Sequence, residues 1–164
     1  MNKESVGQEL NEIKDIFRSR KFGRLFSGET NNTLIQFFRY IFVGGFATVV
    51  DWGLSALLFY AVFGQQYAVA ANSLSFAAGL IVNYLLSTFW IFKESRVKSK
   101  IAEFIGFALI GLVGLLITAG LTLLFRQLLM EITSAYQIIA KITATAVSFL
   151  WNFFARKYLL FSKK

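Results

Sequence analysis

Apolar and polar residues follow one another along the chain in long blocks rather than in a short period. Four apolar runs stand out, at about Phe38–Phe63, Ala68–Phe92, Phe104–Arg126 and Ala135–Phe161. Each reaches the roughly 20 residues that a helix needs to cross a hydrocarbon core of about 30 Å. The runs contain no Pro and lack strict period-two alternation, which favours continuous helices over the strands of a membrane barrel. The pattern predicts an all-α polytopic membrane protein with four transmembrane helices.

The placement of Lys and Arg predicts the orientation of these spans. Fifteen of the 17 basic residues lie in the segment up to Arg39, between the second and third runs, or in the C-terminal end from Arg156 onward. The loop between the first two runs has none, and Arg126 and Lys141 flank the other outer loop. By the positive-inside rule the basic side is cytoplasmic, so both termini are expected inside a cell membrane.

Residues 1–36 form a cytoplasmic basic segment, followed by a transmembrane domain over residues 37–164. The segment has no apolar run of signal-peptide length, so the first span is expected to direct insertion. Its apolar residues recur at helical spacing: Val6, Leu10, Ile13 and Phe17. With Lys14, Arg18 and Lys21 toward the other side, this pattern is typical of an amphipathic helix lying on an anionic inner leaflet. A partly ordered tail whose charges only fix topology is the alternative.

Composition narrows the chemistry that the chain can perform. The sequence is 56% apolar with a mean hydropathy of +0.58, more apolar surface than one soluble core of this size could bury. It has no Cys and no His, which excludes disulfides, thiolate nucleophiles, zinc-finger spacing and imidazole acid–base catalysis. No phosphate-binding Gly loop or acidic metal cluster is present, so neither a cofactor nor a metal is expected. The net charge is +8, but the basic residues flank the spans rather than forming one patch, so nucleic-acid binding is not favoured.

The sequence also repeats itself weakly. An offset of 69 residues aligns the second run with the fourth and pairs Asn83 with Asn152. Each Asn stands a few residues before the aromatic and aliphatic residues that end its run. An offset of 67 aligns the first run with the third and pairs Gly44 with Gly111. Similar offsets predict two tandem helical hairpins that run parallel in the membrane.

Small and polar residues form stripes along the runs, and most are expected to face other helices. Two ionisable residues are harder to place, because a charge at mid-bilayer costs at least about 2.5–3.5 kcal/mol. Asp51 lies about 20 Å, and Lys141 about 28 Å, from the cytoplasmic end of their runs. The two are a candidate structural ion pair. Alternatively Lys141 snorkels outward, and Asp51 is protonated or bonded to Asn83.

A functional interpretation is that Asp51, Asn83 and Asn152 line a polar cavity for a ligand head group. Thr118 is the repeat counterpart of Asp51, so such a site would be asymmetric. Arg39 and Lys93 stand at the inner ends of the first two runs, at the depth of lipid phosphates. They either fix topology or bind the phosphate of a lipid carrier, for which the planar guanidinium of Arg39 is better suited.

Several motifs resemble one known family. The opening of the first run reads Phe37-Phe38-Arg39-Tyr40-Ile41-Phe42-Val43-Gly44-Gly45-Phe46-Ala47-Thr48-Val49-Val50-Asp51, and the second run has Asn83 followed by Phe89-Trp90-Ile91-Phe92. With Glu103-Phe104, Asn152-Phe153 and Lys157-Tyr158, these stretches are similar to the four spans of GtrA-like proteins. The resemblance covers about residues 34–161 and leaves the N-terminal extension outside.

The resemblance implies a role in building cell-surface polysaccharide, as in the glycosylation of teichoic acid or O-antigen. Members are proposed to flip sugars linked to polyprenyl phosphate, such as undecaprenyl phosphate, across the cytoplasmic membrane. By this analogy the substrate-binding candidates are Arg39, Asp51, Asn83, Lys93 and Asn152. The implied partners are the lipid-linked sugar, a membrane glycosyltransferase and further copies of the chain, because four short helices leave little room for a path.

Two other functions compete with translocation. One is a non-transporting subunit that anchors or regulates a polyprenyl-phosphate glycosyltransferase. The other is a small proton-coupled multidrug exporter, which also has four helices and one acid in its first span. Such exporters are shorter and assemble as antiparallel dimers, which require a weaker charge bias than this chain has. An enzymatic activity of its own is not expected.

Overall fold

The computed structural model describes residues 3–28, 30–63, 67–92, 94–128 and 134–161. All regular structure in this part of the chain is helical, as predicted. The α-helices are α1 (Lys3–Arg18), α2 (Gly23–Phe26), α3 (Thr33–Leu57), α4 (Ala68–Leu86), α5 (Lys100–Leu128) and α6 (Ser134–Ala155). Three π-helical segments continue them: η1 (Leu58–Phe63) after α3, η3 (Ser87–Phe92) after α4, and η4 (Arg156–Phe161) after α6.

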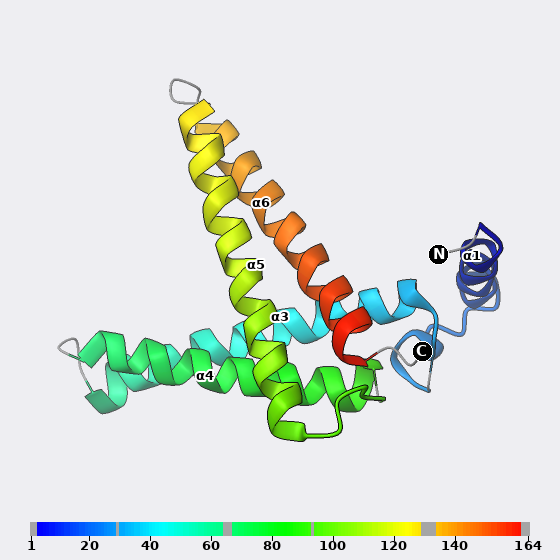
Figure 1. Cartoon of the computed structure of the whole chain (residues 1–164), viewed down its shortest axis with the longest axis horizontal. Helices are drawn as coiled ribbons and strands as arrows, with labels where there is room; N and C mark the ends of the chain where they lie inside the picture. The colour runs from blue at the N-terminus through cyan, green and yellow to red at the C-terminus, as the bar shows by residue number, and fades with distance from the viewer. Residues whose placement is uncertain (1–2, 29, 64–66, 93, 129–133, 162–164) are drawn as a thin grey trace. The chain divides into compact units, whose positions relative to one another are not determined.

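The chain divides into two compact units, residues 1–93 and residues 94–164. In the first unit α3 and α4 lie side by side as a helical hairpin, and in the second unit α5 and α6 do the same (Figure 1). The first unit also carries α1 and α2, which precede its hairpin.

Three helices have the length and apolar content to cross a membrane: Thr33–Val62, Ala68–Phe92 and Lys100–Phe125. Their large apolar side chains are widely exposed, with Tyr60 82% and Val69 81% accessible. Apolar surface on this scale is typical of a chain surrounded by lipid. The three matching runs are therefore confirmed as candidate spans. The fourth predicted run corresponds to α6 and η4, and its crossing stays a prediction.

Helix α3 begins at Thr33, five residues before the apolar run that predicted it. The cause is the preceding residue, Asn32, whose side-chain oxygen accepts hydrogen bonds from the backbone amides of Leu34 (3.0 Å) and Ile35 (3.2 Å). These bonds satisfy amides that have no partner within the helix, as in other N-caps. Capping, rather than hydropathy, sets this boundary.

Helix α1 forms where the amphipathic pattern predicts a helix, and only part of the predicted apolar stripe is buried, with Ile13 packed against the buried cluster. Ile16 is completely buried and packs with Leu25 and Ile35. Leu10 and Phe17, which belong to the predicted apolar face, remain 44% and 58% exposed. Helix α1 therefore docks on the rest of the first unit through Ile16 and keeps a second apolar face open.

In the second unit the core lies between α5 and α6, where Phe107, Ala144 and Phe153 are completely buried. The segment before α5 is tied to the end of α6. The backbone amide of Arg96 donates to the carbonyl of Leu160 (2.7 Å), and its guanidinium donates to the carbonyl of Tyr158 (2.6 Å). These bonds hold the two ends of the second unit together.

Candidate functional site

Arg39 is the most deeply buried cation in the described part of the chain, with 1% of its surface exposed. Its guanidinium is surrounded by backbone carbonyls. The Nε atom donates to Leu25 (2.7 Å), Nη1 donates to Gly28 (2.9 Å) and Trp90 (3.3 Å), and Nη2 donates to two more carbonyls, those of Ser27 (3.1 Å) and Arg24 (3.4 Å). Five acceptors match the five N–H groups of a guanidinium. Arg39 thus joins α2 and the following turn to the ends of α3 and η3.

Gly28 makes this arrangement possible. Its φ angle is +83°, a conformation that residues with a Cβ atom rarely adopt. The turn it forms directs the carbonyls of Ser27 and Gly28 toward Arg39.

Aromatic rings surround the Arg39 cluster. The Arg39 guanidinium lies 5.8 Å from the centre of the Trp90 ring, and Trp90 stacks on Phe26 with ring centres 6.3 Å apart. The Trp90 indole N–H donates to the Phe26 carbonyl (2.7 Å), while Phe38 and Phe42 meet Phe26 edge to face. Such a group of aromatic rings is typical of the membrane–water boundary.

These contacts bear on the expectation that Arg39 binds a lipid phosphate. All its donor atoms are engaged by the protein backbone, so a phosphate could bind only by displacing carbonyls. Arg39 therefore has a structural role in the first unit, and phosphate binding by Arg39 stays a prediction. Its phosphate-binding partner candidate, Lys93, lies outside the described residues.

Asp51 lies where α3 approaches α4 most closely. A Cβ atom added to Gly79 would lie 2.9 Å from the Asp51 Cβ atom and 3.1 Å from the carbonyl oxygen of Ala47. Gly79 is therefore the residue that lets the two helices approach. Asp51 is half-buried, and among the residues described for the first unit no hydrogen bond or ion pair reaches its carboxylate.

One turn further along α3, Ser55 donates a hydrogen bond to the side-chain oxygen of Asn72 on α4 (2.5 Å). Ser75, which is 1% exposed, donates to the Asn72 backbone carbonyl (3.1 Å). Asp51, Ser55 and Asn72 thus form a polar stripe inside an apolar span. The sequence predicts only that such polar residues face other helices, because an amide alone does not reveal its partner.

Asn83 has a local role in the structure. Its side-chain oxygen accepts a hydrogen bond from Ser87 one turn later (3.2 Å), at the start of η3. The next residue, Thr88, has a buried hydroxyl with no hydrogen-bond partner among the described residues. Asn83 and Asp51 lie on neighbouring helices of one hairpin, but the structure records no bond between them.

The second unit has a neutral counterpart to the Asp51 stripe. The hydroxyls of Thr118 on α5 and Ser148 on α6 are 2.5 Å apart, and they lie 3.1 and 2.7 Å from the Gly114 carbonyl oxygen. Since each hydroxyl has one proton, one of them donates to the other, which in turn donates to the carbonyl. Hydroxyl groups that bond across helices replace contacts with water that lipid cannot supply. This pair ties α5 to α6 without any charge.

Asn152 lies one turn beyond Ser148 and packs directly on Gly114. A Cβ atom at Gly114 would come within 2.5 Å of the Asn152 amide nitrogen. The Asn152 amide oxygen is buried and has no hydrogen-bond partner among the described residues. A buried acceptor without a donor is costly, which favours a donor from outside the described residues.

Three charged residues near the start of α5 and in η4 are buried, which the sequence did not predict. Glu103 is completely buried, with its carboxylate 3.1 Å from the ammonium of Lys100. Arg156 is 3% exposed and lies 3.5 Å over the Phe107 ring, beside Gly111, and Lys157 is 9% exposed. Because Arg156 and Lys157 stand at the end of an apolar run, their positions in the sequence indicated only a role in orienting the spans. Only the packing reveals their burial.

Lys141, the other candidate in the predicted ion pair with Asp51, has an exposed side chain on α6. The two residues belong to different units, and the pair stays a prediction.

Comparison with known proteins gives one positive result. The family described as GtrA/DPMS, transmembrane domain, matches residues 39–161, well over half of the chain. Comparisons with curated proteins and with solved structures gave no significant match. The matched range includes both hairpins and begins at Arg39, leaving α1 and α2 outside. The chain therefore belongs to the GtrA/DPMS transmembrane-domain family.

Proposed function

We propose that this chain flips polyprenyl-phosphate-linked sugar across the cytoplasmic membrane, for the glycosylation of teichoic acid or another cell-surface polysaccharide. Family membership indicates involvement in handling such lipids, and translocation is the step that this proposal adds. The role requires polar groups inside the membrane to meet the sugar, while the polyprenyl tail stays in lipid. It requires no nucleophile and no nucleotide site.

The observation that carries the proposal is the Asp51 carboxylate. A membrane acid costs at least about 2.5–3.5 kcal/mol unless something compensates it, and the described residues of its hairpin provide no hydrogen bond or ion pair. A carboxylate readily accepts hydrogen bonds from sugar hydroxyls, and Ser55 and Asn72 supply further polar groups one turn away. In the second unit, the buried Asn152 oxygen is another acceptor that could receive a hydroxyl.

We further propose four spans in two tandem hairpins, with both termini cytoplasmic. Two features of the first hairpin recur in the second at the offsets of the sequence repeat, and they support this arrangement. The π-helical segments η3 and η4 begin at residues 87 and 156, an offset of 69. The close pair of Asp51 and Gly79 in the first hairpin corresponds, at offsets of 67 and 69, to the bonded pair of Thr118 and Ser148 in the second.

Reconstituted transport is the direct test. Purified protein in liposomes that contain labelled polyprenyl-phosphate sugar should give protein-dependent access of the sugar to the opposite leaflet. Asp51→Asn keeps the size of the side chain and removes its charge, and it should lower the translocation rate at least about tenfold, equivalent to the loss of one charged hydrogen bond. Asp15→Asn, the same change on the exposed face of α1, is the matched control and should leave the rate unchanged.

The alternative is a non-transporting subunit of a polyprenyl-phosphate glycosyltransferase. Co-purification of such an enzyme, together with liposomes that translocate no sugar, would favour this role over transport. Normal surface glycosylation in cells that carry Asp51→Asn would remove Asp51 from either mechanism. The family match lends no support to the multidrug exporter. We also expect self-association, since a few short helices enclose little space for a sugar.

A further inference from the structure

The N-terminal helix α1 has three distinct faces. One face, with Glu9, Glu12 and Ile16, is turned toward the beginning of α3. A second face carries Leu10 and Phe17, which stay 44% and 58% exposed. The third is polar, includes Gln8 and Asp15, and is exposed. The exposed apolar face takes no part in the contact with α3, which Ile16 and the partly buried Ile13 supply.

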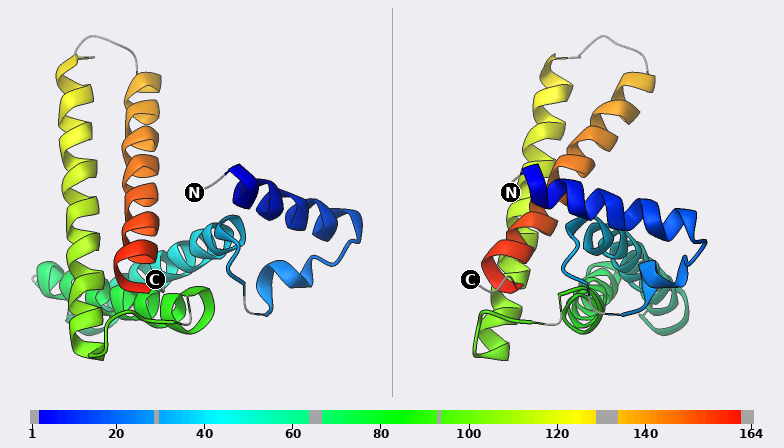
Figure 2. Two further views of the ribbon diagram at one scale, coloured as in Figure 1. Left: turned by 45° about the vertical axis from the view of Figure 1, so that its right-hand side comes forward. Right: turned by 90° about the vertical axis from the view of Figure 1, so that its right-hand side faces the viewer.

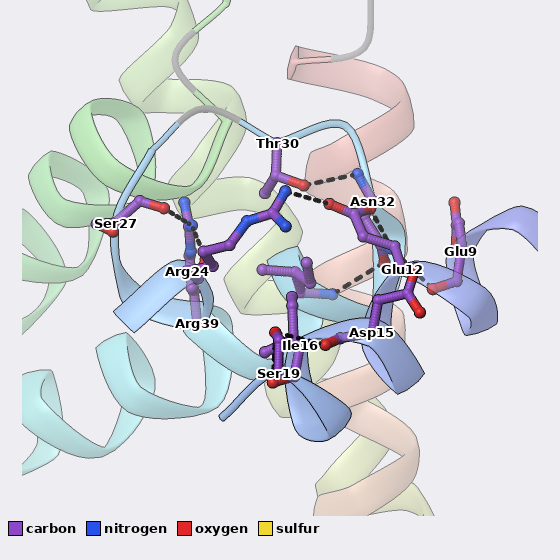
Figure 3. A network of polar contacts seen from close by, with 11 residues as sticks. Glu9, Glu12, Asp15, Ile16, Ser19, Arg24, Ser27, Thr30, Asn32 and Arg39 are labelled. Atoms are coloured by element: carbon purple, nitrogen blue, oxygen red, sulfur yellow. Dashed lines mark hydrogen bonds and ion pairs between the residues drawn. The ribbon is translucent and has the colours of Figure 1, made fainter. Parts of the chain in front are cut away.

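The first face fixes α1 in place. The side-chain amide of Asn32 donates to the backbone carbonyl of Glu9 (3.0 Å) and to the Glu12 carboxylate (2.9 Å). The Thr33 hydroxyl donates to the Glu9 carboxylate (2.9 Å). Arg24 adds an ion pair with Glu12 at 3.9 Å, and Figure 3 shows how these residues converge. Because Asn32 and Thr33 begin the first span, α1 is held at the boundary of the apolar region.

The direction of α1 fits such a boundary. Figure 2 shows α1 crossing the beginning of α3 rather than continuing along it. A helix that crosses the start of a transmembrane span lies roughly in the plane of the membrane surface. The rings of Phe17 and Phe22, 46% exposed, meet edge to face at 5.4 Å and extend the apolar face into the turn after α1.

The exposed charge beside the apolar face is positive. Four basic side chains of this region are exposed: Lys14, Arg18, Arg20 and Lys21. Lys14 and Arg18 lie one turn apart on the flank of the Leu10 and Phe17 face, whereas Glu9 and Glu12 are bonded to the start of α3. Docking of α1 thus engages two acids and leaves the basic residues free to meet an anionic surface.

We propose that α1 and the following turn form a membrane-surface platform that inserts Leu10 and Phe17 among anionic lipid head groups. The apolar side chains enter the boundary between head groups and acyl chains, and the neighbouring basic residues pair with lipid phosphates. This surface lies outside the residues that match the family, so it is independent of the proposed transport.

The absence of Cys from the chain permits a clean test. Single cysteines would replace Leu10 and Phe17 on the apolar face, and Gln8 and Asp15 on the polar face as matched controls. Each full-length variant is labelled with a nitrobenzoxadiazole dye and placed in nanodiscs of phosphatidylcholine, with or without phosphatidylglycerol. The rate of dye reduction by dithionite, which stays in water, then reports the depth of each position.

In nanodiscs with phosphatidylglycerol, dye at positions 10 and 17 should be reduced about tenfold more slowly than at positions 8 and 15, with blue-shifted emission. Replacing both Lys14 and Arg18 by Gln should remove much of this protection, because each basic residue contributes about fivefold to binding an anionic surface. The same reduction rate at all four positions would overturn the proposal. Equal protection in neutral nanodiscs would overturn the part assigned to the basic residues. Using two positions on the apolar face separates insertion from any local effect of removing the Phe17 ring.

Discussion

At the scale of single residues, Arg39 illustrates what a buried cation requires at the base of a membrane span. Water cannot solvate it, and no acid pairs with it among the described residues of its cluster, so five carbonyls from α2, the following turn and η3 accept its hydrogen bonds. The partners belong to segments far apart in the sequence. Arg39 therefore stabilises a tertiary junction rather than its own helix.

Arg39→Lys should weaken this junction although it preserves the charge, because an ammonium has three donors on a flexible stem and cannot reach five carbonyls. We expect the free energy of unfolding to fall by about 2–4 kcal/mol, because each hydrogen bond to a charged group is worth about 1.5–3 kcal/mol. Faster cleavage by trypsin after Arg24 in detergent-solubilised protein would report the release of α2. Arg18→Lys, at an exposed position, is the control. Cleavage of Arg39→Lys at the original rate would mean that the carbonyl contacts contribute little.

Gly79 is the second residue whose chemistry is set by tertiary contact. Gly79→Ala would bring a methyl group within 2.9 Å of the Asp51 Cβ atom and 3.1 Å of a backbone oxygen, so α3 and α4 must move apart. The expected destabilisation is about 1–3 kcal/mol. Gly53→Ala is the matched control, since nothing lies within 4 Å of its added Cβ atom, and it should be neutral or stabilising by up to about 1 kcal/mol. Thermal denaturation in detergent measures both, and equal melting temperatures would contradict the packing argument.

At the scale of elements, each hairpin is joined by a polar contact in addition to apolar packing. Ser55 and Asn72 connect α3 to α4, and Thr118 and Ser148 connect α5 to α6. In lipid, apolar side chains gain little from meeting one another rather than acyl chains, so close packing and polar contacts carry more of the association.

A double-mutant cycle measures the second of these contacts. Thr118→Val, Ser148→Ala and the double variant should show a coupling energy of about 0.6 kcal/mol, and no more than about 1.7 kcal/mol, the range for hydrogen bonds between membrane helices. Thr122→Val, at an exposed position one turn later on α5, replaces Thr118→Val in the control cycle and should show no coupling to Ser148→Ala. Strictly additive effects of Thr118→Val and Ser148→Ala would mean that the close hydroxyls contribute nothing to stability.

At the scale of the whole molecule, the proposed orientation is open to direct labelling. With four spans and both termini cytoplasmic, a cysteine at Gln65 should react with a membrane-impermeant maleimide in intact cells. A cysteine at Ser99, between the second and third spans, should react only after the cells are permeabilised. The cysteine-free parent is the background control. Labelling of Ser99→Cys in intact cells would contradict the charge rule on which the orientation depends.

The sequence predicted the helical class, three of the spans and the family, because each depends on properties that a residue carries with it. Hydropathy over some 20 residues reports lipid burial regardless of what a helix packs against. It also identified Asp51, since an acid in an apolar run is conspicuous before its surroundings are known. The existence of α1 followed in the same way from the spacing of its apolar residues.

The tertiary structure alone decided which donors and acceptors are already engaged and which face of a helix is free. Arg39 and Asp51 are both candidate ligands by sequence, yet carbonyls from distant segments enclose Arg39, and Asp51 has no partner among the described residues of its hairpin. Ile16, which lies outside the predicted apolar stripe, docks α1 together with Ile13 of the stripe, which leaves Leu10 and Phe17 exposed. Hydrogen bonding and burial are properties of pairs of segments, and those pairs exist only once the chain has folded.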